Sequence, residues 1–271
     1  MWTCPACKAV LEQQDNTLRC ANGHSYDTAK EGYVNLLLAH QKRSKAPGDN
    51  KQMINARRAF LEKGFYDPLA ERLGHIIHDY LSSPTLAVFD AGCGEGYYLN
   101  VVKEFLATLD YQVEASGCDI SKVAIQKAAK KYKNNRFCVA STYALPLSDT
   151  SQEAVIQVFA PSSETEVHRV LKKSGLWLQV NPASSHLHQL KDEIYDAAQT
   201  HEKQQQSVAG FEVVLDEELS FDMTMSTPQD TVNLLMMTPF YWSASQESVT
   251  HIQEQLKTVS THFHIRALRK V

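Results

Sequence analysis

Four residues near the start of the chain are potential metal ligands. Cys4 and Cys7 are separated by two residues, and Cys20 and His24, with three residues between them, follow after a gap of twelve. Thiolate and imidazole are preferred ligands of Zn²⁺, and this spacing is typical of a tetrahedral zinc site. Because four protein ligands leave no position for water or substrate, we predict one structural zinc ion that stabilises this segment.

A second stretch that could bind a ligand is glycine-rich and has the sequence VFDAGCGEGYY at residues 88–98. Asp90 precedes Gly92, Gly94 and Gly96, and glycines permit a tight turn whose backbone N–H groups approach a ligand closely. The spacing differs from the GxGxxG pattern of dinucleotide-binding folds. It resembles the signature loop of class I S-adenosylmethionine-dependent methyltransferases, which bind an adenosine with an amino-acid tail.

An acidic residue follows the glycine-rich loop at the expected distance. Asp119 ends an apolar stretch and could accept hydrogen bonds from both ribose hydroxyls of an adenosine. It could instead cap the next helix, but Ser121 is a rival cap, so we favour the ribose role. In the same architecture the loop at residues 140–149 would pass the adenine ring, with Ala140, Ser141 and Leu145 as candidate neighbours.

The elements that must hold these residues alternate along the chain. We predict strands at 86–91, 112–118, 136–140, 154–160 and 175–180, with helices near 97–108, 121–132, 163–171 and 187–197. Alternation of this kind indicates an α/β fold with a Rossmann-like parallel sheet wrapped by helices. Two more strands are predicted at 211–221 and 261–270, with helices near 228–237 and 245–257 between them.

The chain divides into three predicted regions. Residues 1–37 are too few for their own apolar core and form a small zinc ribbon. Residues 38–83 hold a polar, basic linker that ends at a helix start at Asp49 or Asn50, followed by two amphipathic helices. Residues 84–271 form the methyltransferase domain.

Composition limits the function classes. The chain has 271 residues, is 43% hydrophobic and carries a net charge of -4, typical of a globular protein. No apolar run reaches the roughly 20 residues of a membrane span, and no signal peptide is evident, so we expect a cytoplasmic protein. The six cysteines are then expected to be free or metal-bound rather than paired in disulfides.

Positive charge is concentrated near the N-terminus. Residues 1–66 contain ten Lys or Arg and six Asp or Glu, whereas the remainder is acidic. These positively charged side chains could bind a phosphate backbone or could simply form a solvent-exposed face. The residues concerned are Lys42, Arg43, Lys45, Lys51, Arg57 and Arg58.

Taken together, these motifs resemble the bacterial 23S rRNA guanine-N1-methyltransferase family over nearly the full length. The likeness includes AKEGYVNLL, KRSKAPGDN, ARRAFLEKGFYDPL, DISKVAIQKAAKKY and MTPFYW. The resemblance implies S-adenosylmethionine and one zinc ion as cofactors, and an rRNA hairpin gripped by the N-terminal region. From the charge pattern, the candidate RNA contacts are Lys42, Arg43, Lys45, Arg57 and Arg58. It also implies that Tyr66, Gly94, Glu95 and His186 line the cofactor site.

Several roles stay open on the residues alone. Tyr66 could cover the methionine end of the cofactor or be an ordinary core tyrosine, and His186 by itself reads as a surface residue. A ring nitrogen as target fits the absence of an Asn/Asp-Pro-Pro-Tyr signature after the fourth predicted strand, where the sequence is FAPSSE. Glu164 and His186 are candidates for the general base that guanine N1 requires. The aromatic candidates to stack on the base are Phe159, Phe240, Tyr241 and Trp242, although such a run is more often core.

Two other functions are compatible with these motifs. A small-molecule methyltransferase would use the zinc ribbon only as a structural element, and its activity would not depend on the basic residues. A zinc-dependent RNA-binding protein with an inactive methyltransferase fold would fail to bind S-adenosylmethionine. A homodimer that clamps RNA between two zinc modules is also compatible with the sequence.

Overall fold

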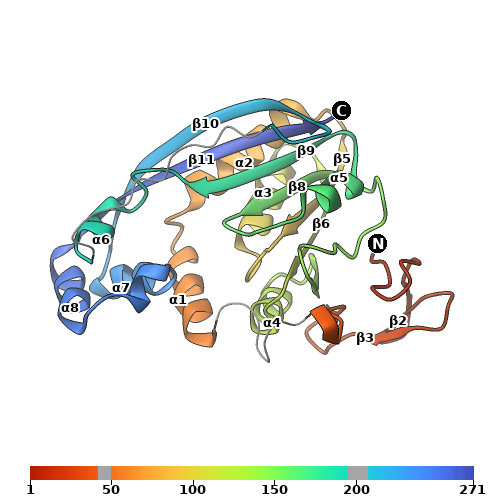
Figure 1. Cartoon of the computed structure of the whole chain (residues 1–271), viewed down its shortest axis with the longest axis horizontal. Helices are drawn as coiled ribbons and strands as arrows, with labels where there is room; N and C mark the ends of the chain where they lie inside the picture. The colour runs from red at the N-terminus through yellow and green to blue at the C-terminus, as the bar shows by residue number, and fades with distance from the viewer. Residues whose placement is uncertain (42–49, 195–206) are drawn as a thin grey trace.

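The computed structural model describes residues 1–41, 50–194 and 207–271, with the Trp242 side chain excluded. Figure 1 shows a twisted central sheet flanked by helices, with the N-terminal strands and a group of helices at opposite ends of the long axis. In the described part of the chain, no helix combines the length and the apolar character needed to cross a membrane.

The main sheet contains eight strands in the order β10-β11-β9-β8-β5-β6-β7-β4. Its parallel part confirms the predicted α/β fold, and β11 runs antiparallel to both β9 and β10. The chain order reverses at β5, which lies between β6 and β8, and ligands of open α/β sheets bind beside the strand ends at such a point. The strands are β4 (Val34–Asn35), β5 (Thr85–Ala91), β6 (Gln112–Asp119), β7 (Arg136–Val139), β8 (Gln152–Val158), β9 (Leu171–Pro182), β10 (Phe211–Thr224) and β11 (Thr258–Lys270).

The helices follow the predicted apolar periodicity closely. They are α1 (Lys51–Leu61), α2 (Asp67–Tyr80), α3 (Tyr97–Thr108), α4 (Lys122–Lys131), α5 (Glu164–Val170), α6 (His188–Asp192), α7 (Pro228–Met236) and α8 (Gln246–Gln255), with short 3-10 turns η1 (Ala39–Gln41) and η2 (Pro239–Trp242). Asn50 caps α1 by accepting a hydrogen bond from the Met53 N–H, as one of the two predicted starts required. Residues 195–197, the end of the helix predicted after His186, lie outside the described residues.

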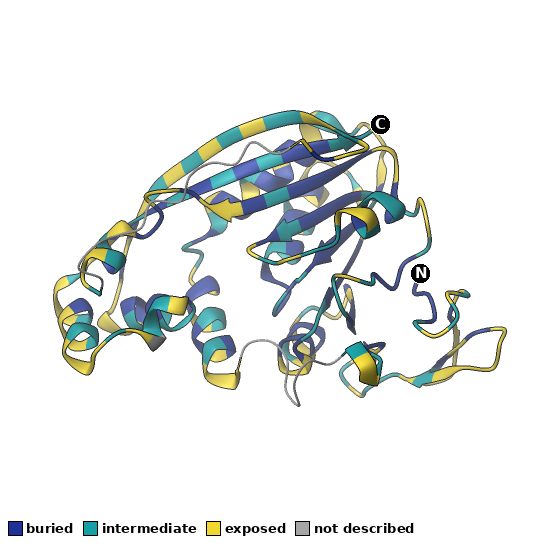
Figure 2. Ribbon diagram, viewed as in Figure 1, coloured by how far each residue is buried: buried dark blue, intermediate teal, exposed yellow. Residues whose placement is uncertain are grey.

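Alternate residues of β5 enter two cores on opposite faces of the sheet, so this strand is buried on both sides (Figure 2). Leu86 and Val88 pack with the apolar stripes of α2, α3 and α4. Phe89 and Ala91 pack with α5 and with the N-terminal segment. The contact of α2 with α3 is very close at Gly74, where an added Cβ would lie 2.4 Å from a Phe105 ring carbon.

The N-terminal segment is joined to the main sheet by its own residues. A small sheet of β1 (Glu12–Gln14), β2 (Thr17–Arg19) and β3 (Ser25–Asp27) holds the metal ligands, whereas β4 pairs in parallel with β7 at the sheet edge. Trp2 bridges to Leu147 and packs edge-on against Phe89, with ring centroids 6.4 Å apart. The segment therefore shares a core with the sheet instead of forming its own.

The helices at the end of the molecule opposite the N-terminal strands pack against one another. Helix α1 packs against α7, and α7 contacts α8 and η2. Lys63, just after α1, pairs with the buried carboxylate of Asp230 at 2.5 Å. Asp230 also accepts the Thr227 N–H in a capping box that starts α7. This ion pair joins the segment between β4 and β5 to the helices inserted between β10 and β11.

Candidate cofactor and metal sites

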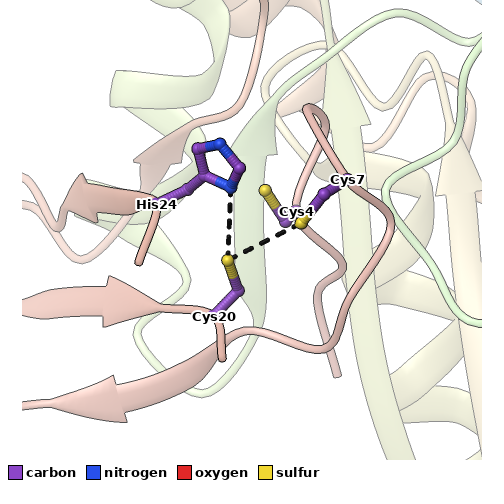
Figure 3. Close-up of side chains that lie close together, drawn as sticks. All are labelled: Cys4, Cys7, Cys20 and His24. Carbon is purple, nitrogen blue, oxygen red and sulfur yellow. Dashed lines mark hydrogen bonds between the residues drawn. The ribbon is translucent and has the colours of Figure 1, made fainter. Parts of the chain in front are cut away.

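The four predicted metal ligands lie together in space (Figure 3). Their ligand atoms are all within 4.8 Å of one another. The sulfurs of Cys7 and Cys20 are 3.7 Å apart, and the Cys20 sulfur is 3.4 Å from His24 Nδ1. A tetrahedral zinc ion with Zn–S bonds of about 2.3 Å has S···S edges of roughly 3.8 Å. The donor set and its spacing therefore fit one zinc ion.

Two tight turns present these ligands. The Lys8 N–H donates to the Cys4 carbonyl at 2.8 Å, and the Gly23 N–H donates to the Cys20 carbonyl at 3.0 Å. Hydrogen bonds from Asn22 and from the Ala9 backbone lower the pKa of the Cys7 thiol to about 6, which favours the thiolate that binds zinc. Burial raises the pKa of Cys20, and a bound cation would offset that cost.

The glycine-rich loop connects β5 to α3 at the switch point of the sheet. The N–H groups of Gly92 and Cys93 both donate to the Cys118 carbonyl at 2.9 Å, which folds the loop over the end of β6. Gly92 has φ +91° and an added Cβ would lie 2.4 Å from the Ala160 Cβ. At Gly94 an added Cβ would meet no atom within 4 Å, so the loop backbone faces open space.

That open space is part of a cavity of about 1210 Å³. One end is formed by the glycine-rich loop and the end of β6. The remaining lining comes from the loops after β8 and β9 together with α6 and η2, named here the acceptor end, and from α1, whose Leu61 lies beside Glu95 of the glycine-rich loop. The predicted site residues that line it are Tyr66, Gly92, Gly94, Glu95, Asp119, His186, Glu164 and Arg57. Asp90, Gly96 and Ser141 do not line it.

Asp119 lies where a ribose-binding carboxylate is expected. Its Oδ2 accepts the Gly94 N–H at 3.0 Å and its Oδ1 accepts the Ser121 N–H at 2.7 Å. Ser121 caps α4 by accepting the Ala124 N–H, so Asp119 is not the helix cap. The carboxylate is thereby fixed between the loop and α4 while it still lines the cavity.

Asp90 is buried below the glycine-rich loop with 1% of its surface exposed. Neither carboxyl oxygen has a hydrogen-bond partner within the described residues. Burial, followed by the nearby charges of Asp119 and Glu95, raises the pKa of Asp90 to about 8. The Asp119 and Glu95 carboxyl groups, which line the cavity, make this end suited to a cationic ligand, and S-adenosylmethionine carries positive charge on its sulfonium and its ammonium group.

Because the pKa of Asp90 is raised, we expect the free energy of unfolding to depend on pH. The carboxyl of the unfolded chain ionises above a pKa near 4, whereas the folded one keeps its proton up to about pH 8. The unfolded state then binds fewer protons, so the free energy of unfolding falls as the pH rises through this window. Between pH 6 and 7.5 we expect the wild type to lose roughly 2 kcal/mol relative to Asp90→Asn in chemical denaturation without cofactor. Equal pH slopes for the two proteins would contradict this assignment.

Tyr66 is both a core residue and a residue of the cavity lining, the two positions that were open from the sequence. It is 1% exposed and packs edge-on against Phe60, Phe221 and Phe263, as a core tyrosine does. It also lines the cavity beside the glycine-rich loop, and burial raises its pKa, so it remains a neutral phenol.

His186 is buried, so its assignment to the surface from the residues alone was wrong. It is 6% exposed, and its ring centroid lies 4.7 Å from that of Phe263. Burial, and then the Lys191 charge, lower its pKa to about 3, so the ring is neutral at physiological pH. Nδ1 accepts the His262 backbone N–H at 3.2 Å, so the single proton of the neutral ring is on Nε2. This tautomer is a hydrogen-bond donor, which argues against His186 as the base.

The other candidates are distributed around the acceptor end of the cavity. Glu164 is exposed at the first turn of α5 and lines the rim, where a carboxylate can accept a proton. Phe159 has a positive φ of 53° and is 41% exposed, an unusual backbone for a bulky residue that turns its side chain toward the cavity. Phe240 of η2 lines the same end. Ser141 instead accepts the Tyr143 N–H within its own loop.

The predicted RNA-binding residues do not share one location in the structure. Lys42, Arg43 and Lys45 lie outside the described residues. Arg57 lines the cavity, whereas Arg58 pairs with Glu62 at 2.7 Å. Glu62 also pairs with Lys131 of α4 at 2.7 Å, so Arg58 is part of the contact between α1 and α4.

The comparisons with known proteins agree with this geometry. A zinc-ribbon family model described as RlmA, N-terminal matches residues 2–45, and a model described as a methyltransferase domain matches residues 82–255. YxjB of Bacillus subtilis (strain 168), provisionally named a 23S rRNA (guanine-N(1)-)-methyltransferase, is 31% identical over 265 residues, which cover 94% of this chain and 91% of YxjB. This chain belongs to the 23S rRNA (guanine-N1)-methyltransferase family.

A second relative of the family is the 23S rRNA (guanine(748)-N(1))-methyltransferase of Streptomyces fradiae. It is 38% identical over 192 residues, which cover 70% of this chain and 66% of the relative. Among solved structures, the YcgJ protein of Bacillus subtilis superposes with a TM-score of 0.48 and 17% identity, over 73% of this chain and 97% of that one. Family membership makes the chain an S-adenosylmethionine-dependent methyltransferase with a zinc ribbon.

Sequence reasoning missed two groups of residues near the cavity. Lys191 lines its acceptor end from α6, and Lys127 of α4 lines a small neighbouring recess with Glu95 and Tyr97, with Lys130 three residues further along the same helix. The lysines of α4 could have been noticed, because residues 120–136 contain five lysines and an arginine without any acidic residue. Lys191 carried no such signal, because only the packing of α6 against the sheet brings it to the site.

Proposed function

We propose that this enzyme transfers a methyl group from S-adenosylmethionine to N1 of a guanine in a hairpin of 23S rRNA. The observation that supports it best is one continuous cavity lined both by the glycine-rich loop with its acidic residues and by aromatic side chains and hydrogen-bond donors, in a chain of this family. A substrate of this kind would place the enzyme in the cytoplasm.

The acidic end would hold the cofactor. The Asp119 carboxylate would accept hydrogen bonds from the ribose hydroxyls, and Glu95 would balance the positive charge of the methionine end. Gly94 would let the tail lie against the loop backbone, and Tyr66 would close this end from the side of α2. When bound, S-adenosylmethionine supplies an activated methyl group on a sulfonium.

The protein must then orient guanine and remove its N1 proton. N1 lies on the Watson–Crick edge, so the base must be unpaired or flipped to enter the cavity. Phe159 and Phe240, which line the cavity, would contact its ring. The N1 proton would pass to the Glu164 carboxylate or to water, and the N1 lone pair would form the new N–C bond as the C–S bond breaks and its electron pair stays on sulfur.

Helix α4 would carry part of the RNA contact. It begins at the cavity with Ser121 and Ala124, and the other end reaches the segment after the zinc ligands, where Lys133 Nζ donates to the Glu31 carbonyl at 3.3 Å. Its ten residues span about 15 Å, enough to meet two or three phosphates. The described structure shows no ion pair for Lys127 or Lys130.

This surface predicts a charge-specific loss of RNA affinity. The double variant Lys127→Gln and Lys130→Gln should weaken binding of an unmodified 23S rRNA hairpin about tenfold, and should reduce the slope of log affinity against log salt by about 1.5. The matched control is Lys173→Gln with Lys257→Gln, which removes two exposed charges elsewhere. Equal losses in both double variants would show that net charge alone acts.

Methyl transfer to 23S rRNA tests the proposed function directly. Purified enzyme, radiolabelled S-adenosylmethionine and rRNA from a strain lacking this gene should give label that co-migrates with 1-methylguanosine after nuclease digestion. Label on another base position, or none on rRNA but transfer to a small molecule, would refute the proposal. Failure to bind S-adenosylmethionine in calorimetry would indicate an inactive RNA-binding protein instead.

A further inference from the structure

One cationic side chain faces the acceptor end of the cavity from a helix that the function described so far does not use. Lys191 lies on α6 and lines the cavity together with His186 and Phe240. Its ammonium is 5.7 Å from the centroid of the Phe240 ring, close enough for a cation–π contact. Among the described residues no carboxylate lies within ion-pair distance of it.

The partly buried surroundings of Lys191 strengthen the electrostatic interactions of its ammonium group. The side chain is half-buried, and desolvation lowers its pKa from the ordinary value. The titratable groups coupled to it are Asp192 on the same helix and His186 on the preceding loop. Glu193, the next acidic residue, pairs with His251 at 3.4 Å. A partly desolvated ammonium interacts more strongly with a developing negative charge than one in water.

Guanine presents such a charge during the proposed reaction. When the N1–H bond breaks, its electron pair is shared between N1 and the O6 carbonyl oxygen. A cation beside O6 therefore favours loss of the N1 proton, and it is needed most in the transition state. His186 offers only a neutral Nε2–H, which can orient O6 but supplies no charge. Glu164 offers the complementary acceptor for the N–H groups of the same edge.

We propose that the Lys191 ammonium binds O6 of the target guanine and stabilises the negative charge that forms there as N1 loses its proton. This inference rests on the proposed function. The atoms balance as described above: the N1 proton leaves to Glu164 or water, methyl replaces it, and O6 returns to a neutral carbonyl. Lys191 keeps its proton throughout.

The test compares Lys191→Met, Lys191→Arg and the control Lys173→Met with the wild type on unmodified 23S rRNA. For Lys191→Met we expect kcat to fall about 100-fold, as when one donor to a developing oxyanion is removed. The pH at which kcat levels off should rise by about one unit or more, because N1 then ionises without the cation. Lys191→Arg should recover part of both, and Lys173→Met should match the wild type.

Binding measurements separate the other roles that a cation could have. We expect the affinity of Lys191→Met for S-adenosylmethionine and the KM for RNA to stay within about threefold of wild type. A loss of cofactor affinity would assign Lys191 to the cofactor carboxylate, and a rise in KM alone would assign it to a phosphate, and either result overturns the proposal. If 1-methylguanosine forms but kcat and its pH profile are unchanged, Lys191 has no role at O6 and the proposed function stands. If the wild type forms no 1-methylguanosine, both fall.

Discussion

Replacing Cys7 by serine should release the zinc ion and lower the rate of rRNA methylation by at least about 100-fold. A serine hydroxyl is a poor zinc ligand, and structural zinc supplies about 10–16 kcal/mol in zinc-finger peptides. The short strands β1 to β3 have few other stabilising contacts, so the turns that present Cys4 and Cys20 should unfold. The region proposed to hold the hairpin against α4 would then be lost.

The same variant should still bind its cofactor. The glycine-rich loop is held by Cys118 of β6 and by Asp119, which are not members of the metal-ligand cluster. We expect the dissociation constant for S-adenosylmethionine, measured by calorimetry on the full-length variant, to change less than about fivefold. A control is Cys138→Ala, which removes a buried thiol outside the metal cluster and should leave one zinc per chain by elemental analysis. Normal methylation by zinc-free Cys7→Ser would refute a supporting role for zinc.

Replacing Asp119 by alanine should weaken S-adenosylmethionine binding by about 100-fold or more. The carboxylate would lose two charge-assisted hydrogen bonds to the ribose, and hydrogen bonds to charged groups contribute about 1.5–3 kcal/mol each. The change would also leave the N–H groups of Gly94 and Ser121 without their acceptor, so the loop would lose a fixed contact with α4. Calorimetry would measure the affinity, and methyl transfer at saturating cofactor would measure the recovery of rate.

Two further variants make the Asp119 prediction specific. Asp119→Asn keeps the shape and one carbonyl acceptor, so we expect an intermediate loss of affinity. Asp79→Asn removes a half-exposed carboxylate that lies 3.9 Å from Arg72 on the far side of α2, and it should bind the cofactor normally. Unchanged affinity in Asp119→Ala would remove the ribose role and leave Asp119 with a structural one.

Burial changes the chemical role that can be assigned to His186. From its neighbours in NPASSH it reads as exposed, because the segment is polar. In the structure, Phe159 of the loop after β8 and Phe263 of β11 contact its ring, although they are far apart in the sequence. Burial keeps its imidazole neutral, and the His262 N–H bound to Nδ1 leaves the proton on Nε2, so the tertiary structure converts a candidate base into a donor.

The sequence by itself determined the order of strands and helices after residue 50, the four zinc ligands, and the pairing of the glycine-rich loop with Asp119. These features depend on short-range spacing and on the periodicity of apolar residues, which any segment carries locally. Only the tertiary structure decided that β4 extends the main sheet, that α4 links the cavity to the zinc-binding segment, and that Lys191 and Phe240 meet at one end of the cavity. Those contacts join residues distant in the chain, and their geometry comes from how whole elements pack, which local pattern does not specify.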